Sequence, residues 1–325
     1  MIQWRECITT WELNGALKRI LKESEQWNVM LVTYTLYHVV LVQSVFSIIQ
    51  CMTFREMHQP GNPFILANAW DSGSAKILAA SGAKAIGSTS AGFAMTLGVK
   101  DMGQIIREQT LNYAQQLVNA TSLPVSGDLE NGYGHCPSDV AETILFSSKF
   151  GLAGASIEDT QLPSLEPYPF TLAVERIEAA VDSIHHLNQD FVLTARADGI
   201  MNQKYDCDEA IRRLQAFAAV GADVVYAPCP PSLDELARIC REVDAPVNAL
   251  ISEDFIQYSI DDFSQIGVAR ISLGSSLARA TYTTILKRIQ EIYSKGNFGC
   301  LQDTMSYTEI EKMFQQIEGS DKRTL

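Results

Sequence analysis

Short apolar runs recur along the chain from Phe64 onward, and each is followed by a polar or glycine-rich loop and then by a segment with helical periodicity. Eight runs predict strands, at Phe64–Asn68, Ala85–Ser88, Leu123–Asp128, Ala153–Glu158, Phe191–Ala195, Asp223–Ala227, Val247–Ile251 and Ala269–Leu273. The helical patterns between and after them are Ser74–Ala80, Ile105–Val118, Ser138–Phe150, Leu172–Leu187, Cys207–Ala219, Leu233–Glu242 and Ser276–Ser294. The chain therefore alternates strand and helix.

This alternation predicts a parallel sheet, because strands that are apolar on both faces need helices to cover them. Eight such units over about 230 residues suit a closed (β/α)8 TIM barrel, which typically has roughly 250 residues. An open, doubly wound sheet is the alternative, since closure leaves no mark in a sequence, but neither Gly-x-Gly-x-x-Gly after the first strand nor a P-loop supports it. A last helical pattern, Thr308–Ile317, lies outside the eight units and needs a partner surface.

The first 51 residues differ in composition from the rest. They hold four basic and four acidic residues, so that residues 52–325 carry the whole formal net charge of −13. From Gln26 to Phe54 there is no Asp, Glu, Lys or Arg. We expect residues 1–51 to be an apolar extension outside the fold and residues 52–325 to be the catalytic barrel with its C-terminal helices. A membrane or interfacial anchor at residues 28–52 and a packed accessory element stay open as alternatives.

The net charge and the cysteine pattern indicate which binding partners and which cellular compartment to expect. Asp and Glu outnumber Lys and Arg by 38 to 25, so the protein repels a polyphosphate backbone and we expect no nucleic-acid partner. The seven cysteines are scattered and contain no Cys-x-x-Cys pair. This usage is typical of a reducing compartment, and we expect a cytoplasmic protein with free thiols.

Polar residues gather where three predicted strands end, which is where a barrel of this kind places its chemistry. The candidate metal ligands there are Asp128, Glu130 and Glu158. Crowded carboxylates resist ionisation unless a cation joins them, and oxygen ligands without His or Cys favour Mg²⁺, or Mn²⁺, over Zn²⁺. Arg196 falls at the same rim. Asp159 and Asp198 follow strand ends too, but each has the alternative role of a helix N-cap.

Three further features are candidate binding elements at this rim. Ser90, Ala91 and Gly92 predict a small-residue loop whose backbone N–H groups would hold a carboxylate or an oxyanion. Trp70 follows the first strand and is expected to line the pocket. Tyr133, between two glycines, offers a hydroxyl on a flexible turn, although a plain surface turn accounts for the same pattern.

Several motifs in order along the chain resemble those of the isocitrate lyase and phosphoenolpyruvate mutase superfamily, over about Phe54 to Lys295. They are Asn68-Ala69-Trp70-Asp71, Ser90-Ala91-Gly92, Gly98-Val99-Lys100-Asp101, Asp128-Leu129-Glu130-Asn131-Gly132-Tyr133-Gly134, Ile157-Glu158-Asp159, Ala195-Arg196 and Pro246-Val247-Asn248. The resemblance implies a (β/α)8 barrel whose final helix is exchanged between subunits, commonly in a homotetramer. It also implies a small-molecule substrate, a 2-oxo or 2-hydroxy carboxylate bound with Mg²⁺.

The resemblance also implies a role for each residue that matches a functional position of the family. The metal-site acids of the family correspond to Asp128, Glu130 and Glu158. Glu130 stands where many members have Asp. Asp101 resembles the loop aspartate near the metal, Arg196 the arginine that holds the substrate carboxylate and the developing enolate charge, and Asn248 a substrate-contacting position.

The chain departs from the lyases of this family directly after Asp159. Those lyases carry a Lys-Lys/Arg-Cys-Gly gating segment with the catalytic acid and base, whereas residues 160–167 contain neither Lys nor Cys. Cys136 and Cys229 fall near the same rim as candidate replacements, although a lone thiol is more often an inert apolar group.

The sequence thus predicts a Mg²⁺-dependent lyase that cleaves a C–C bond of a small 2-oxo or 2-hydroxy acid through an enolate. Its catalytic candidates are Arg196, Tyr133 and Asp101. One alternative is P–C bond chemistry of the phosphoenolpyruvate mutase or phosphonopyruvate hydrolase type. The other is a barrel that binds a metabolite without turning it over.

Overall fold

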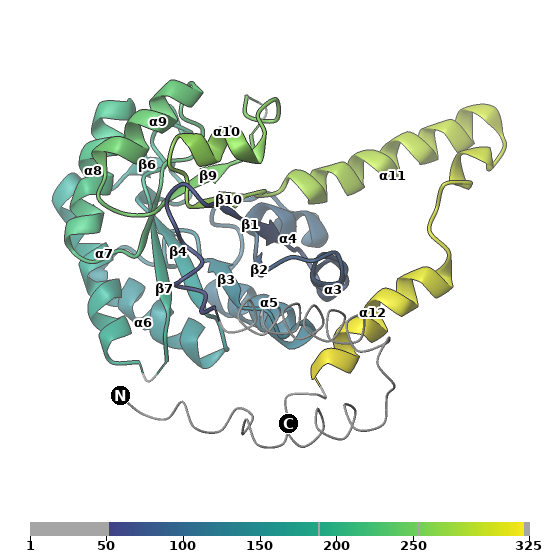
Figure 1. Ribbon diagram of the computed structural model, residues 1–325, viewed down its shortest axis with the longest axis horizontal. Helices are drawn as coiled ribbons and strands as arrows, with labels where there is room; N and C mark the ends of the chain where they lie inside the picture. Colours follow the sequence, from purple (N-terminus) through teal and green to yellow (C-terminus); the bar gives the residue numbers. More distant parts are fainter. Residues whose placement is uncertain (1–51, 188, 253, 322–325) are drawn as a thin grey trace, which may run out of the picture. The chain divides into compact units, whose positions relative to one another are not determined.

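The computed structural model describes residues 52–187, 189–252 and 254–321, and its centre is a closed barrel of eight parallel strands (Figure 1). The strands are β1 (Phe64–Asn68), β2 (Ala85–Gly87), β3 (Val125–Asp128), β4 (Gly154–Glu158), β7 (Val192–Arg196), β8 (Val224–Tyr226), β9 (Val247–Leu250) and β10 (Arg270–Ser272). They neighbour one another in chain order, and β10 pairs with β1 to close the barrel. All eight predicted strands and the predicted (β/α)8 barrel are confirmed.

Helices cover the outside of the barrel, and α11 projects away from it (Figure 1). The helices are α3 (Ser72–Ala80), α4 (Ser90–Leu97), α5 (Arg107–Ala120), α6 (Pro137–Lys149), α7 (Phe170–His185), α8 (Cys207–Ala219), α9 (Leu233–Glu242), α10 (Ile260–Gln265), α11 (Ser276–Lys295) and α12 (Tyr307–Asp321). All the predicted helices are present, with ends shifted by at most two residues except at Thr308–Ile317, which extends further. Two helices, α4 and α10, were not predicted.

Helix α4 corrects one expectation. The small-residue loop predicted at Ser90 to Gly92 is the first turn of this helix, and the Thr89 hydroxyl caps it by accepting a hydrogen bond from the Gly92 N–H at 3.2 Å. The sequence of α4 carries no charged residue. It therefore lacks the polar face that would mark it as an amphipathic helix.

The segment 1–51 lies outside the described residues, so the proposed boundary near Met52 and the alternatives for residues 28–52 stay predictions. In the described part of the chain, no helix is both long enough and apolar enough to cross a membrane.

The C-terminal helices leave an apolar surface open. Helix α12 packs against α3, and Lys76 lies 5.6 Å from the centre of the Phe314 ring, which supplies the partner surface that the last helical pattern needed. In α11, by contrast, Ala278 alone is buried, while Ile285 and Tyr293 are exposed. Exchange of a helix between subunits stays a prediction.

The base of the barrel is closed by an apolar cluster with a buried histidine beside it. The cluster consists of Phe54, Phe64, Leu66, Ala85, Val192 and Val224. His58 meets the rings of Phe54 and Phe64 edge-on, at centroid distances of 4.9 and 5.0 Å. Its Nδ1 lies 2.9 Å from the Phe54 carbonyl oxygen and its Nε2 3.3 Å from Nη1 of Arg270. A neutral imidazole that donates from Nδ1 and accepts at Nε2 satisfies both contacts.

A short hairpin follows β4 where the lyases carry their gating segment. Its strands are β5 (Thr160–Gln161) and β6 (Glu166–Pro167), and they pair antiparallel. Each strand is only two residues long, too short for a periodic pattern, so the sequence did not predict the hairpin.

Both ends of this hairpin are held by the buried Asp159 and by Arg213 of α8. The Asp159 carboxylate accepts hydrogen bonds from Tyr205 Oη at 2.7 Å and from Arg213 Nη1 at 3.0 Å. Arg213 also donates to the Tyr168 carbonyl at 3.0 Å and pairs with Glu209 at 2.8 Å. The ion pair therefore fastens the hairpin to the barrel wall.

We predict that His58 makes the fold sensitive to acid. Burial and the neighbouring Arg270 charge lower the pKa of His58 to about 3, whereas in the unfolded chain it titrates near its ordinary value of about 6.5. Below pH 6.5 the unfolded state therefore binds a proton that the folded state does not, and stability falls. Between pH 7 and pH 5 the His58→Gln variant should lose about 2 kcal/mol less unfolding free energy than the wild type, measured by urea titration. Equal losses in the two proteins would contradict this assignment.

We also predict that Arg213→Met lowers the unfolding free energy by about 3–5 kcal/mol, because it leaves the buried Asp159 carboxylate without its cation. Arg212→Met is the matched control: Arg212 is the next residue, pairs with the same Glu209 at 2.7 Å and is exposed. The Arg212→Met variant should lose about 1 kcal/mol of unfolding free energy or less. Chemical denaturation measures both, and similar losses would show that the ion pair does not hold the hairpin.

Candidate active site

A cavity of about 270 Å³ opens at the end of the barrel where the strands finish. Eight of the predicted site residues line it: Ser90, Ala91, Asp101, Asp128, Glu130, Glu158, Arg196 and Asn248. They come from different strands and loops, and the parallel sheet brings them together because its strands all end at the same rim.

Arg196 lies among three carboxylates in this cavity. Its Nη1 is 2.9 Å from Asp128 Oδ1, and its Nη2 is 3.3 Å from Glu158 Oε2 and 2.6 Å from Asp198 Oδ2. Strand register explains the arrangement, since Glu158 and Arg196 are paired at the ends of β4 and β7. Burial disfavours the guanidinium charge, but the three carboxylates outweigh burial and raise the pKa of Arg196 well above its ordinary value. Arg196 is therefore a permanent cation.

The acids around it exceed the positive charge that Arg196 supplies. Asp101 Oδ1, Glu130 Oε2 and Glu158 Oε1 are buried oxygens without a hydrogen-bond partner. Burial and neighbouring acids raise the pKa of Glu130 to about 7, and burial and Asp198 raise that of Glu158 well above its usual range. Burial and Asp128 raise the pKa of Asp101 as well.

These unpartnered oxygens fit a hard divalent cation, which would remove the electrostatic reason for the raised pKa values. Nowhere among the described residues do three His, Cys, Asp or Glu side chains form a ready metal cluster. Mg²⁺ keeps several waters when it binds to proteins, so one or two of these acids would suffice as direct ligands.

Backbone groups fix two of the acids. The Ser90 N–H at the start of α4 donates to Asp128 Oδ2 at 3.0 Å, and the Gly103 N–H donates to Glu130 Oε1 at 3.2 Å. The Ser90 amide, expected to face an oxyanion, is thus occupied by a side chain of the protein. Asp198 and Asp159 do not cap helices: Asp198 binds Arg196, and the Asp198 N–H donates to Asp159 Oδ1 at 2.8 Å.

Gly92 and Trp70 lie outside the lining of the cavity. A Cβ atom on Gly92 would come within 2.5 Å of Thr89 Cγ2 and 3.1 Å of Trp70 Cβ, so this glycine permits close packing at the start of α4. Their predicted contact with substrate has no support in this placement.

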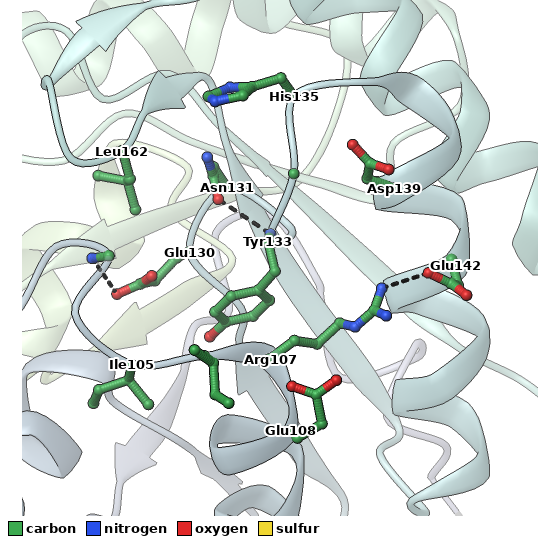
Figure 2. A pocket seen from close by; sticks show the side chains of 13 residues that line it. Ile105, Arg107, Glu108, Glu130, Asn131, Tyr133, His135, Asp139, Glu142 and Leu162 are labelled. Carbon is green, nitrogen blue, oxygen red and sulfur yellow. Dashed lines mark hydrogen bonds and ion pairs between the residues drawn. The ribbon is translucent and has the colours of Figure 1, made fainter.

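Tyr133 lines a second, larger pocket of about 490 Å³ beside the barrel mouth (Figure 2). Its N–H donates to Asn131 Oδ1 at 3.1 Å, and its ring lies in the same lining as Arg107, which pairs with Glu142 at 2.7 Å. Burial and Glu130 raise the pKa of Tyr133 well above its usual range, so its hydroxyl stays protonated. Glu130 belongs to the lining of both pockets.

The cavity lining also contains residues that were not predicted from the sequence, among them Tyr226 and Arg270. Arg270 was detectable as the charged residue inside the apolar run Ala269–Leu273. Neither Cys136 nor Cys229 lines the cavity, and burial raises the pKa of the Cys229 thiol, so their placement gives no support to a catalytic role for either.

Comparison with known proteins identifies the family. The model of the phosphoenolpyruvate phosphomutase family matches residues 54–293. A crystal structure of a Burkholderia cenocepacia protein described as a lyase/mutase is 40% identical, has a TM-score of 0.77, and the match covers 81% of this chain and 94% of that one. A protein of Mycobacterium tuberculosis is 34% identical, and the 2-methylisocitrate lyase of Shewanella oneidensis 27% identical, each match covering 69% of this chain and 82% of the relative. The chain belongs to the phosphoenolpyruvate mutase family, within the superfamily of enzymes that also contains the isocitrate lyases and acts on C–C or P–C bonds.

Proposed function

We propose that the protein is a Mg²⁺-dependent lyase that cleaves a C–C bond of a small 2-oxo or 2-hydroxy carboxylic acid through an enolate. One observation carries the proposal: unpartnered carboxylate oxygens surround the same cavity as a permanent Arg196 cation. This combination supports the binding of a metal ion together with an anionic substrate. The kinship with a 2-methylisocitrate lyase agrees with it.

The residues that would hold the metal are Asp128, Glu130 and Glu158, with Asp101 beside them. When bound, Mg²⁺ supplies Lewis-acid polarisation of the substrate's α-oxygen and carboxylate, and Mn²⁺ suits the same oxygen ligands. The protein's own contribution is to hold these oxygens in a buried position before the substrate arrives.

Arg196 would stabilise the enolate charge. Its Nε and Nη2 donate to the two Asp198 oxygens at 3.1 and 2.6 Å, which fixes the plane of the guanidinium. Such a preorganised donor is effective because it does not have to reorient while charge develops. Asn248 is fully buried and lines the same cavity, which supports its proposed contact with substrate.

Asp101 is the best-placed group for moving a proton. It lines the cavity, its Oδ1 has no hydrogen-bond partner among the described residues, and burial and Asp128 raise its pKa. Tyr133 also remains proton-bearing but lies in the second pocket, so its proposed catalytic role has weaker support than that of Asp101.

P–C bond chemistry is the second candidate function, because the matching family is described by the phosphomutase reaction. It would use the same acids and Arg196. A barrel that binds a metabolite without turnover is the third candidate. It has the least support, since the charged residues of the site are all retained.

The quaternary structure and location follow as further proposals. We propose a homotetramer in which α11 is exchanged between subunits, supported by its exposed Ile285, Leu286 and Tyr293. We also propose a cytoplasmic location, on the cysteine usage of the chain.

The deciding assay incubates the full chain and Mg²⁺ with a panel of 2-oxo and 2-hydroxy diacids and follows pyruvate release. Phosphonopyruvate in a parallel incubation tests the second candidate, through release of phosphate or formation of phosphoenolpyruvate. Tight oxalate binding without turnover of any compound would favour the third candidate and contradict the proposal.

We predict that Asp128→Ala abolishes Mg²⁺-dependent turnover and changes the melting temperature little. Arg196 keeps Glu158 and Asp198 as partners in this variant, and one of several mutually repelling acids is lost. Glu142→Ala, in the second pocket, is the control and should keep wild-type kinetics. Loss of folding in the Asp128 variant would show that this residue is structural.

We predict that Arg196→Lys lowers kcat and kcat/KM together, by roughly 100-fold or more, because a lysine ammonium does not reproduce the planar guanidinium held by Asp198. Steady-state kinetics separate this from simple anchoring, in which KM rises while kcat survives. Wild-type kinetics with a lowered melting temperature would remove Arg196 from the mechanism and leave it a structural ion pair.

A further inference from the structure

Arg176 is a buried cation on α7, and only 1% of its surface is exposed. Arg196 and Arg213 pair with acids, whereas Arg176 forms no ion pair with any Asp or Glu in the described part of the chain. Its guanidinium carbon lies 4.0 Å from the centre of the Tyr168 ring. Because a buried charge without a counter-ion is costly, its compensation comes from this ring and from hydrogen bonds.

The guanidinium of Arg176 binds one turn at three points. This turn, which we call the Asn131 turn, comprises residues 131–135 and follows β3. The Arg176 Nη1 donates to the carbonyl oxygens of Gly134 at 2.8 Å and His135 at 2.6 Å, and its Nη2 donates to the Asn131 carbonyl oxygen. A planar group with several N–H donors can hold three carbonyls at once, which the point charge of a lysine does not reproduce.

Tyr168, whose ring lies against the guanidinium, holds the same turn. Its Oη accepts a hydrogen bond from Asn131 Nδ2 at 3.1 Å and lies 3.3 Å from the Gly134 carbonyl oxygen and 2.9 Å from His135 Nδ1. Asn131 Oδ1 in turn accepts the Tyr133 N–H at 3.1 Å (Figure 2). Both the backbone and the side chain of Asn131 are therefore fixed.

The backbone at this turn has an unfavourable conformation. The φ angles of Glu130, Gly132 and Tyr133 are 47°, 81° and 62°. This left-handed region suits glycine, but it is costly for a glutamate or a tyrosine because their Cβ atoms are crowded there. Such residues keep a strained conformation only where the surrounding contacts impose it. Since Glu130 directly precedes Asn131, the contacts of Arg176 fix the chain on one side of Glu130.

Glu130 is fixed on its other side by contacts within the site. Its carbonyl oxygen accepts the Glu158 N–H at 2.9 Å, and its Oε1 accepts the Gly103 N–H at 3.2 Å (Figure 2). Its Oε2 is buried and has no hydrogen-bond partner among the described residues. Arg176 lines neither the barrel cavity nor the second pocket, so it contacts this site only through the Asn131 turn.

We propose that Arg176 is a positioning residue for the metal site, which holds the Asn131 turn so that Glu130 presents its unpartnered oxygen to the metal. The inference rests on the proposed function, in which Glu130 is a metal ligand. Without the three carbonyl contacts, Glu130 would be free to leave its left-handed conformation and to move its carboxylate away from Glu158. This role gives a reason for a buried cation where neutral side chains would cost the fold less.

Calorimetric titration of the full chain with Mn²⁺ alone tests this without any substrate. The wild type should bind Mn²⁺. Arg176→Lys keeps the charge but loses the planar group, so it should weaken Mn²⁺ binding roughly tenfold or more, as is typical when a residue that supports a metal ligand is replaced. Glu130→Gln removes the ligand itself and should weaken Mn²⁺ binding at least as much.

Arg55→Lys is the matched control. Arg55 also donates to a backbone carbonyl, that of Phe191 at 2.8 Å, and pairs with Asp190 and Asp223, but these residues precede β7 and β8 and lie at the opposite end of the strands from the site. The Arg55→Lys variant should have a lowered melting temperature and the wild-type affinity for Mn²⁺.

Tyr168→Phe provides a second test, which stands even if the Arg176→Lys variant does not fold. It keeps the ring against the guanidinium and removes the hydroxyl that binds Asn131. It should therefore weaken Mn²⁺ binding by a smaller factor than Arg176→Lys.

The failures of the two proposals are distinguishable. An Arg176→Lys variant with a lowered melting temperature and wild-type Mn²⁺ affinity overturns the positioning role, and so does a Tyr168→Phe variant with wild-type affinity. A loss of affinity greater than that of Glu130→Gln, or an equal loss in Arg55→Lys, overturns it as well, because the effect then does not pass through Glu130. A wild type that does not bind Mn²⁺ overturns the proposed metal site and this inference with it.

Discussion

The balance of buried charge at the mouth of the barrel is the constraint on which the rest of the site depends. Asp128, Glu158 and Asp198 all lie within ion-pair distance of one guanidinium, that of Arg196. Charges removed from water are tolerated only when they are paired and hydrogen-bonded, and one cation does not neutralise three acids. This excess of negative charge is the physical basis of the proposed cation site.

The same charges connect the site to the hairpin that follows β4. Asp198, which orients Arg196, has its backbone N–H bonded to Asp159, and Asp159 is paired with Arg213. Asp159 therefore contacts both the residue that orients Arg196 and the residue that holds the hairpin. In this chain the hairpin supplies no Lys or Cys to the reaction, and its contribution lies in the position it gives to the groups behind it.

Much of this architecture was predictable because each unit of the barrel repeats one pattern. The strands are short apolar runs, and the helices Cys207–Ala219 and Leu233–Glu242 each begin directly after a capping side chain, Asp206 and Ser232, so their bounds could be predicted. Helix α4 escaped prediction because it is apolar on all sides, and α10 because six residues carry little periodicity. The sequence also predicted that the acidic residues at the strand ends lie close together, because parallel strands all end at the same rim of the barrel.

The orientation of individual side chains was not predictable in this way. Tyr133 belongs to the same motif as Asp128, yet its backbone has φ of 62° and its side chain lines the neighbouring pocket. Motif spacing fixes neither such left-handed turns nor the direction of the side chains that they carry.

The distribution of charge along the barrel axis bears on which bond is broken. Carboxylates and Arg196 lie at the mouth, where the strands end, whereas Arg270 lies at the start of β10 beside His58. The proposed metal and the acid end of a substrate would bind at the mouth, so the proposed chemistry belongs there. Because the hairpin supplies no Lys or Cys, the proposed reaction would take its proton from the cavity lining, where Asp101, Glu130 and Glu158 each combine an unpartnered oxygen with a raised pKa. Under the proposed function, the departure of this chain from the lyase motif would therefore move the proton donor into the cavity, while the acids and Arg196 keep their proposed roles.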